Sequence, residues 1–134
     1  MNPFAFAQTY AATLDLQSQV ADDIEAALAT MSADEDVRDR AHLIATELFS
    51  NSVEHSCAYD ASQHVTLEAW GLDDQGIAIR VTDTGAGFDS LPESSLPDDP
   101  FAEGGRGLFL IDALAQKVTH EDRGRRVAAE FHPA

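Results

Sequence analysis

Apolar and polar positions follow two different periods along this chain, and the order of those periods predicts its elements. Apolar residues recur at helical spacing in some stretches and alternate with polar residues in others. The predicted strands cover residues 6–14, 64–71, 77–82, 117–121 and 125–131, and the predicted helices cover residues 19–30, 34–56 and 107–116. Ser32 followed by Glu35 matches a capping box, which predicts that the second helix begins near Asp34. This order favours an α+β fold, a two-layer sandwich in which three helices cover one face of a mostly antiparallel sheet.

The second predicted helix carries polar residues on its apolar side. Its apolar face is defined by Val37, Ile44 and Leu48. Helical spacing places Asn51 and His55 in the middle of that face and Glu47 at its edge. Burying an unpaired polar group costs about 1–3 kcal/mol. Either something polar lies over this helix, or the pattern is accidental.

The size and composition of the chain are those of one globular domain over residues 1–134. The chain is 44% apolar with five prolines and eight glycines, which indicates autonomous folding. A loop runs from Asp83 to Gly105 and contains Pro92, Pro97 and Pro100. A loop of this length in a small domain is typical of a functional segment.

The net charge of −16 argues against a nucleic-acid partner, which requires a stripe of basic residues, and against anionic membranes. The one basic cluster, Arg123, Arg125 and Arg126, lies in a predicted hairpin turn. No signal peptide and no membrane-spanning apolar run is present, so a cytoplasmic location is expected. Cys57 is the single cysteine, which predicts an inert free thiol and no cysteine-based zinc site.

The first segment with candidate chemistry is Glu47–His55, where Glu47, Asn51 and His55 follow one side of the helix. The amide oxygen of Asn51 suits Mg²⁺, and Glu47 lies one turn away, where it could accept a proton from an attacking hydroxyl. The alternative is that these polar residues reach solvent at the helix end. A zinc site from Glu47 and His55 is disfavoured, since no cysteine or second helical histidine completes a tetrahedron.

The second segment follows the strand over 77–82. Alternation places Asp83 on the buried face at the end of this strand, where its carboxylate needs a donor such as an adenine amino group. Gly85 and Gly87 would allow positive φ angles and a close approach to a flat ring. The alternative is an ordinary turn after a strand.

The third segment, Gly104-Gly-Arg-Gly-Leu108, leads directly into the third predicted helix. Glycines before a helix start direct free N–H groups to one place, which is typical of a phosphate cradle. The segment is neither a Walker A loop nor a dinucleotide fingerprint. A flexible lead-in to the helix is the alternative.

In order and spacing, the three segments resemble the N, G1 and G2 boxes of the GHKL ATPase superfamily, which has the Bergerat ATP-binding fold. The stretches Glu47-Leu-Phe-Ser-Asn-Ser-Val-Glu-His55, Asp83-Thr-Gly-Ala-Gly-Phe-Asp89 and Gly105-Arg-Gly-Leu-Phe-Leu-Ile111 look most like bacterial anti-sigma-factor serine/threonine kinases. The resemblance covers nearly the whole chain. Each box alone is weak, and three in order are a strong match.

The resemblance implies a role for each matching residue. Asn51 would coordinate the Mg²⁺ bound to the phosphates, and Glu47 would be the general base. Asp83 would bind the adenine amino group, and Gly85 and Gly87 would shape its pocket. Gly105, Gly107 and Leu108 would contribute the phosphate-binding helix start, with Arg106 as a charge partner and residues 88–104 as a lid. His55 would serve in packing or in support of the site.

The implied reaction is phosphoryl transfer from MgATP to a serine or threonine of a STAS-type anti-anti-sigma protein. The same domain would bind a sigma factor as a homodimer and release it when the antagonist binds. One alternative is a histidine-kinase catalytic domain, although the first 35 residues lack a helical hairpin carrying a phosphoacceptor histidine. The others are a nucleotide-gated binding module without transfer, and an acidic α+β domain in which the boxes are coincidental.

Overall fold

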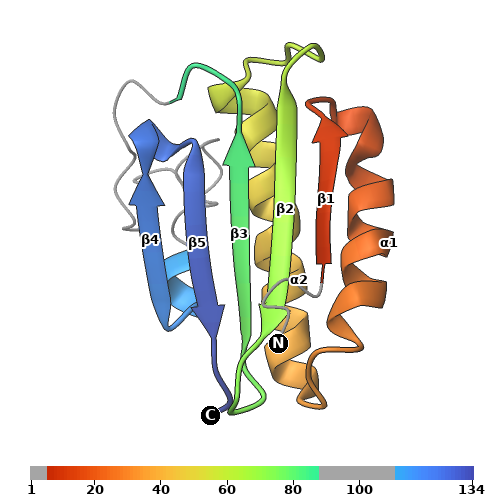
Figure 1. Cartoon of the computed structure of the whole chain (residues 1–134), viewed down its shortest axis with the longest axis vertical. Coiled ribbons are helices and arrows are strands. Elements are labelled where there is room, and N and C mark those ends of the chain that lie inside the picture. Colours follow the sequence, from red (N-terminus) through yellow and green to blue (C-terminus); the bar gives the residue numbers. More distant parts are fainter. Residues whose placement is uncertain (1–5, 88–110) are drawn as a thin grey trace.

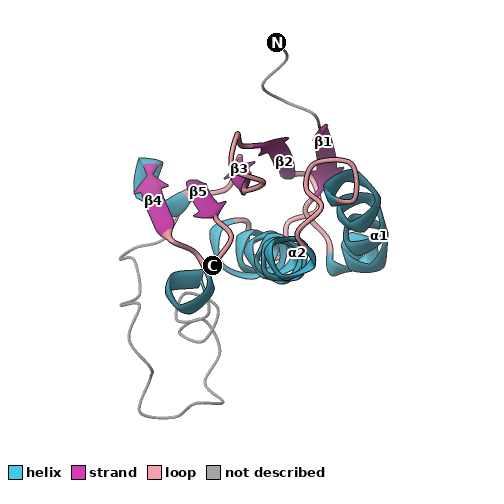
Figure 2. Cartoon of the chain, turned by 90° about the horizontal axis from the view of Figure 1, so that it is seen from below, coloured by secondary structure: helices cyan, strands magenta, loops and turns pink. Residues whose placement is uncertain are grey.

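The structure, a computed structural model, describes residues 6–87 and 111–134 and contains one sheet of five antiparallel strands. The strands are β1 (Phe6–Ala11), β2 (His64–Gly71), β3 (Ile77–Asp83), β4 (Lys117–Glu121) and β5 (Arg126–Phe131), in the order β1-β2-β3-β5-β4. Two long helices, α1 (Gln17–Leu28) and α2 (Glu35–Asn51), cover one face of the sheet (Figures 1 and 2). Residues 111–114 form a short helical segment on the same face (Figure 2). The predicted α+β, two-layer fold is therefore confirmed.

The core lies between the sheet and the helices. It contains Val20, Ile24 and Leu28 of α1, Val37, Ile44, Leu48 and Phe49 of α2, and Val65, Leu67, Ile77, Ile79 and Phe131 of the sheet. All of these side chains are at most 3% exposed. The apolar face predicted for α2 thus packs against the sheet as expected. Among the described helices, none is long and apolar enough to cross a membrane.

The N-terminal strand is shorter than predicted. The expected strand over 6–14 ends at Ala11, and Leu14–Leu16 form a 3₁₀ turn. The hydroxyl of Thr13 accepts a hydrogen bond from the amide of Asp15 at 3.2 Å and caps this turn. A local hydrogen bond of this kind ends the strand although the apolar alternation continues.

The predicted capping box at Ser32 is wrong. Asp34 is the N-cap of α2, because its Oδ1 accepts a hydrogen bond from the Val37 amide at 3.0 Å. The hydroxyl of Ser32 instead donates to the carbonyl of Gln75 at 2.6 Å. Ser32 therefore joins the start of α2 to the turn between β2 and β3.

The helix predicted to reach residue 56 changes its hydrogen bonding before it ends. Ser52–Ser56 form a π-helical turn, in which the Cys57 amide donates to the Ser52 carbonyl at 2.8 Å. Ala58 and Tyr59 then take positive φ angles of 49° and 62°, which end the helix. A π turn holds one residue more than an α turn, so it changes the side of the helix on which Ser56 lies.

The other boundaries differ by a few residues from the prediction. α1 begins and ends two residues earlier than the expected 19–30. The described part of the third helix ends at residue 114 rather than 116, and residues 107–110 lie outside the described ranges. The second hairpin has its turn at Asp122–Gly124, between β4 and β5.

Candidate functional site

Asp83 is a buried carboxylate at the end of a central strand. It is the last residue of β3, follows the buried side chains of Ile79 and Val81 on the same face, and is 4% exposed. Its amide donates to the carbonyl of Arg125 at 2.8 Å. Because side chains alternate between the two faces along β3, the Asp83 carboxylate lies on the core-facing side of the sheet, next to the end of α2.

The two oxygens of the Asp83 carboxylate have different environments. Oδ1 accepts hydrogen bonds from the Ser56 hydroxyl at 2.6 Å and from the Gly85 amide at 2.9 Å. Oδ2 is buried and accepts no hydrogen bond from any residue in 6–87 or 111–134. A buried acceptor without a donor is costly, so Oδ2 is suited to a ligand that brings an N–H group.

Ser56, which sequence reasoning missed, joins the π turn at the end of α2 to the turn after β3. It is 2% exposed, and its hydroxyl oxygen accepts a hydrogen bond from the Gly87 amide at 3.0 Å. Its carbonyl accepts another from the Ala86 amide at 2.8 Å. No periodic signal marks Ser56, because its orientation depends on the π turn and its partners lie about thirty residues later.

The two glycines of this turn serve different purposes. Gly87 has a φ of 82°, in agreement with the predicted positive φ. Gly85 has no positive φ, so that part of the prediction is wrong. A Cβ atom at Gly85 would overlap the backbone carbonyl of Ser56, so glycine is required there for the close approach of the turn to α2.

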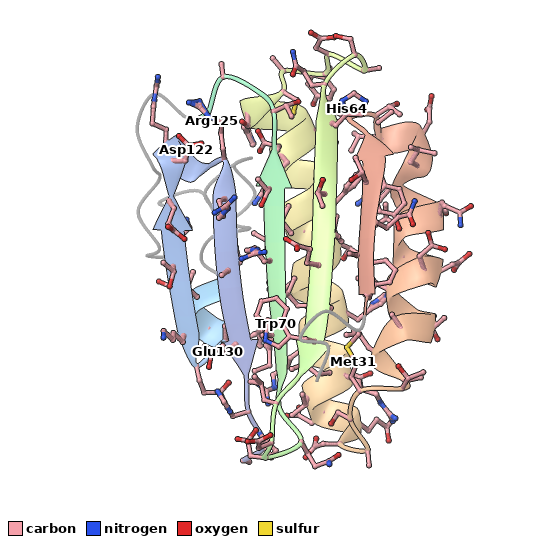
Figure 3. All side chains as sticks on the ribbon, viewed as in Figure 1. Met31, His64, Trp70, Asp122, Arg125 and Glu130 are labelled. Atoms are coloured by element: carbon pink, nitrogen blue, oxygen red, sulfur yellow. The ribbon has the colours of Figure 1, made fainter. Side chains whose placement is uncertain are left out.

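Arg125 supports the same turn from the hairpin between β4 and β5. Its Nη1 donates to the carbonyl of Ala86 at 3.0 Å, and its Nε lies 3.3 Å from Oδ2 of Asp122. Figure 3 shows Arg125 and Asp122 at the end of the sheet where His64 begins β2. At least one arginine of the basic cluster is therefore a structural residue rather than part of a binding surface.

The polar residues predicted on α2 lie at its C-terminal end, which is the end of the sheet where β3 finishes (Figure 1). Glu47, Asn51 and His55 are each half-buried. Within the described part of the chain, the side chains of Glu47 and Asn51 make no hydrogen bond with another residue, whereas His55 Nε2 lies 3.9 Å from a carboxylate oxygen of Glu54. The amide and the carboxylate are thus available to a ligand.

The sequence of this chain matches a known protein family over most of its length. Residues 10–131 match the family model of the histidine kinase-like ATPase domain. The chain belongs to this family. The expected membership of the GHKL superfamily is therefore confirmed.

A solved histidine kinase domain has a similar fold. It is the histidine kinase domain of the blue-light activated histidine kinase from Erythrobacter litoralis EL346, with a TM-score of 0.53 and 21% sequence identity. The similarity covers 87% of this chain and 59% of that chain, and at this identity it shows the fold alone. No curated protein matches the chain in sequence.

Histidine kinase-like ATPase domains bind ATP with Mg²⁺, and the described residues fit both. The unpaired Oδ2 of Asp83 fits the amino group of adenine. The amide oxygen of Asn51 fits Mg²⁺, which takes few protein ligands and completes its shell with phosphate oxygens and water. Among the described residues, no group of three His, Cys, Asp or Glu side chains could hold a metal ion.

The phosphate-binding part of the predicted site lies outside the described residues. This applies to Gly105, Arg106, Gly107 and Leu108, and to the predicted lid over residues 88–104. The helical segment that follows is part of the histidine kinase-like core, because Ile111 is fully buried and Leu114 packs against the same cluster.

Cys57, next to Ser56, is a buried free cysteine. Burial and the nearby charge of Asp83 raise the pKa of its thiol to about 11. A thiol with this pKa is not a nucleophile at neutral pH, in agreement with the predicted inert cysteine.

Proposed function

We propose that this histidine kinase-like ATPase domain is an anti-sigma serine/threonine kinase. It would bind MgATP, transfer the γ-phosphate to a serine or threonine of a STAS-type anti-anti-sigma protein, and sequester a sigma factor in the cytoplasm. The main support for a nucleotide site is the buried Asp83 carboxylate. Its Oδ2 has no hydrogen-bond donor among the described residues and lies beside the end of α2.

The roles of the residues follow from their chemistry. Asp83 would accept a hydrogen bond from the adenine amino group, and the turn at Gly85 and Gly87 would form the wall beside the ring. The amides of Gly105, Gly107 and Leu108 would donate to the phosphates, with Arg106 as a further positive charge. With adenine at Asp83, beside Ser56, the triphosphate would extend towards Asn51 and Glu47 of α2.

Transfer would depend on two residues of α2. Asn51 would hold Mg²⁺, which when bound neutralises charge on the phosphates. Glu47, one turn earlier, would accept the proton of the attacking hydroxyl. Phosphoryl transfer needs mainly positioning and charge neutralisation, so these two side chains and a helix N-terminus would supply much of the catalysis.

Support for the serine-directed, partner-switching function comes from the resemblance of the three boxes to anti-sigma-factor kinases. In that function the domain would form a homodimer and bind a sigma factor until the antagonist displaces it. The structural similarity to a histidine kinase domain supports a second candidate, a catalytic domain that phosphorylates a histidine on a separate protein.

The test is incubation of the protein with γ-labelled ATP, Mg²⁺ and each STAS-type protein encoded in the same genome. We expect label on one serine or threonine of one such protein, and none when that residue is replaced by alanine. Label on a histidine of another protein would establish the second candidate instead. Tight ATP binding without transfer to any partner would indicate a nucleotide-gated binding module.

Sigma-factor sequestration needs a separate measurement. We expect size-exclusion chromatography to show a complex of the protein with one sigma factor in the presence of MgATP. Addition of the unphosphorylated antagonist should dissociate this complex, and addition of the phosphorylated antagonist should not. A sigma complex that the antagonist leaves intact would contradict partner switching.

A further inference from the structure

We propose that Ser56 makes the nucleotide site selective for a purine that carries an amino group at C6, by holding the Asp83 carboxylate in one orientation. This inference rests on the proposed ATP site and adds the residue that determines its base preference. The Ser56 hydroxyl is the one side-chain donor to Asp83 among the described residues.

The direction of each hydrogen bond at Ser56 is determined by its neighbours. The Gly87 amide donates to the Ser56 hydroxyl oxygen at 3.0 Å. A hydroxyl has a single proton, and the Ser56 proton is donated to Oδ1 of Asp83 at 2.6 Å. The result is a continuous chain of donors from Gly87 through Ser56 to Asp83, in which each bond strengthens the next.

This chain distinguishes the two oxygens of Asp83. Oδ1 has two donors, the Ser56 hydroxyl and the Gly85 amide, whereas the buried Oδ2 has none within the described residues. Turning the plane of the carboxylate away from this orientation would break both hydrogen bonds, from the Ser56 hydroxyl and from the Gly85 amide. Oδ2 is therefore the oxygen that Asp83 offers to a ligand.

A carboxylate oxygen that is held in this way discriminates between amino and carbonyl groups. An ionised carboxylate only accepts hydrogen bonds, so it pairs with the C6 amino group of adenine and repels the C6 carbonyl of hypoxanthine or guanine. Sites built around a buried hydrogen bond reject ligands that lack the matching group far more strongly than apolar pockets do. Loosening the carboxylate should weaken this rejection.

The contribution of the hydroxyl can be separated from the fold at this position. In Ser56→Ala the backbone carbonyl still accepts the Ala86 amide, and the Gly85 amide still donates to Asp83. The π turn and the close approach of Gly85 also remain, since both involve backbone atoms. The substitution removes the hydroxyl as donor to Asp83 and as acceptor of the Gly87 amide, and it keeps the backbone contacts that attach the turn to the π turn after α2.

The experiment measures the Kd of ATP and of ITP, each with Mg²⁺, by isothermal titration calorimetry. ITP keeps the ribose and triphosphate and replaces the C6 amino group with a carbonyl. We expect the wild type to bind ITP about 100-fold more weakly than ATP. In Ser56→Ala we expect ATP affinity to fall about 10-fold and ITP affinity to change much less, so that the preference for ATP falls about 10-fold.

Two further variants control the measurement. Ser56→Thr keeps a hydroxyl and should restore the preference, whereas Ser50→Ala removes a hydroxyl on α2 that donates only to the Glu47 carbonyl at 3.1 Å and should leave both Kd values unchanged. Circular dichroism and the melting temperature monitor folding. If Ser56→Ala does not fold, Ser56→Cys, which has a weak S–H donor, carries the same expectation.

The outcomes separate this inference from the proposed function. A wild type that binds neither nucleotide overturns the proposed function. A wild type that prefers ATP, together with an Ser56→Ala variant that loses both affinities equally or keeps the full preference, overturns the role of Ser56 while the ATP site stands.

Discussion

Glu47 is the residue whose proposed role is easiest to separate from binding. It is half-buried on α2, and its carboxylate makes no hydrogen bond within the described residues. Glu47→Gln keeps the shape but removes the proton acceptor, so we expect phosphoryl transfer to fall at least about 100-fold with an unchanged Kd for ATP. Single-turnover transfer of labelled phosphate and calorimetric titration measure the two quantities.

The matched control is Asp39→Asn, which removes a carboxylate from an exposed position of the same helix. We expect this variant to transfer phosphate at the wild-type rate. A Glu47→Gln variant that retained full transfer would show that another group, or none, accepts the proton.

Gly85 packs directly against the backbone carbonyl of Ser56, in the π turn that follows α2. Gly85→Ala should lower the free energy of unfolding by about 1–3 kcal/mol, because the added methyl overlaps the Ser56 carbonyl and the turn must move. Urea denaturation measures this loss.

The control is Ala58→Gly, the opposite change in a neighbouring segment. It removes a methyl group from a residue with a positive φ of 49°, a backbone conformation that favours glycine. We expect it to leave the stability unchanged or to raise it by up to about 1 kcal/mol. An unchanged unfolding free energy in Gly85→Ala would contradict the requirement for glycine at that position.

Among the elements, α2 is tied to the C-terminal part of the sheet by one arginine. The guanidinium of Arg40 donates to the carbonyls of Leu114 and His132, each at 2.7 Å, and to Asp36 Oδ2 at 2.9 Å. Its side chain is 14% exposed. Arg40 therefore joins three segments: α2, the end of the helical segment 111–114, and the residue after β5.

Arg40→Ala should lower the free energy of unfolding by about 2–4 kcal/mol, because two carbonyls lose charged donors. Arg40→Lys keeps a charged donor and should recover part of this loss. The recovery should be incomplete, because an ammonium group cannot reproduce the planar guanidinium fork. The control is Arg38→Ala on the same helix, where one hydrogen bond of 3.3 Å to the Ser32 carbonyl is lost and a change below about 1 kcal/mol is expected. Equal losses in the two alanine variants, measured by urea denaturation, would rule out a special role for Arg40.

At the scale of elements, the apolar period predicted the helices and strands because each has one buried face. Val37, Ile44 and Leu48 are all buried where helical spacing places them. The predicted start of α2 near Asp34 is confirmed, but Ser32 was wrongly assigned as the capping residue because it binds Gln75, 43 positions away, and local spacing contains no information on that partner. The π turn was missed because it spans only Ser52–Ser56, which is too short a stretch for the apolar pattern to indicate a change from α to π hydrogen bonding.

Part of the candidate site was predictable because polar residues interrupt an apolar pattern. Asp83 ends a buried face of β3, and Asn51 interrupts the apolar side of α2. Ser56 in the site and Arg40 outside it were not predictable, because they bind backbone groups or residues far along the chain. Such contacts exist only after the sheet and the helices have come together.

At the scale of the whole molecule, His132, which follows β5, binds the turn between β2 and β3. The strength of this contact depends on the pH, because His132 is titratable. Its Nδ1 lies 2.7 Å from Asp74 Oδ2 in the turn between β2 and β3, and its Nε2 lies 3.1 Å from Glu130 Oε1 on β5. Glu130 also has Lys117 at 3.9 Å. The hydrogen bonds to Asp74 and Glu130 raise the pKa of His132 above its usual 6.5, and that to His132 lowers the pKa of Asp74 below 3.8.

Because the folded-state pKa of His132 is raised, its contribution to stability is fully present below pH 6.5 and is lost as the pH rises through the raised pKa. The lowered pKa of Asp74 keeps the contact intact on the acid side until the pH falls below its usual 3.8. We expect the melting temperature of wild type to exceed that of His132→Gln at pH 6 and to approach it at alkaline pH. Asp74→Asn should reduce this pH dependence. A difference that is constant from pH 6 to alkaline pH would contradict the assignment.

The order of the strands also has a consequence for the synthesis of this protein. β5 pairs with β3 on one side and with β4 on the other, and among the described strands β4 has no other partner. While a ribosome extends the chain, β4 therefore has no strand to pair with, and the backbone N–H and C=O groups along one edge of β3 stay unpaired until residues 126–131 emerge. An unpaired strand edge is a template for pairing with another chain, so we expect the chain to be prone to aggregation at this stage. A stop codon just before Arg126 would thus remove two strands from the sheet rather than one.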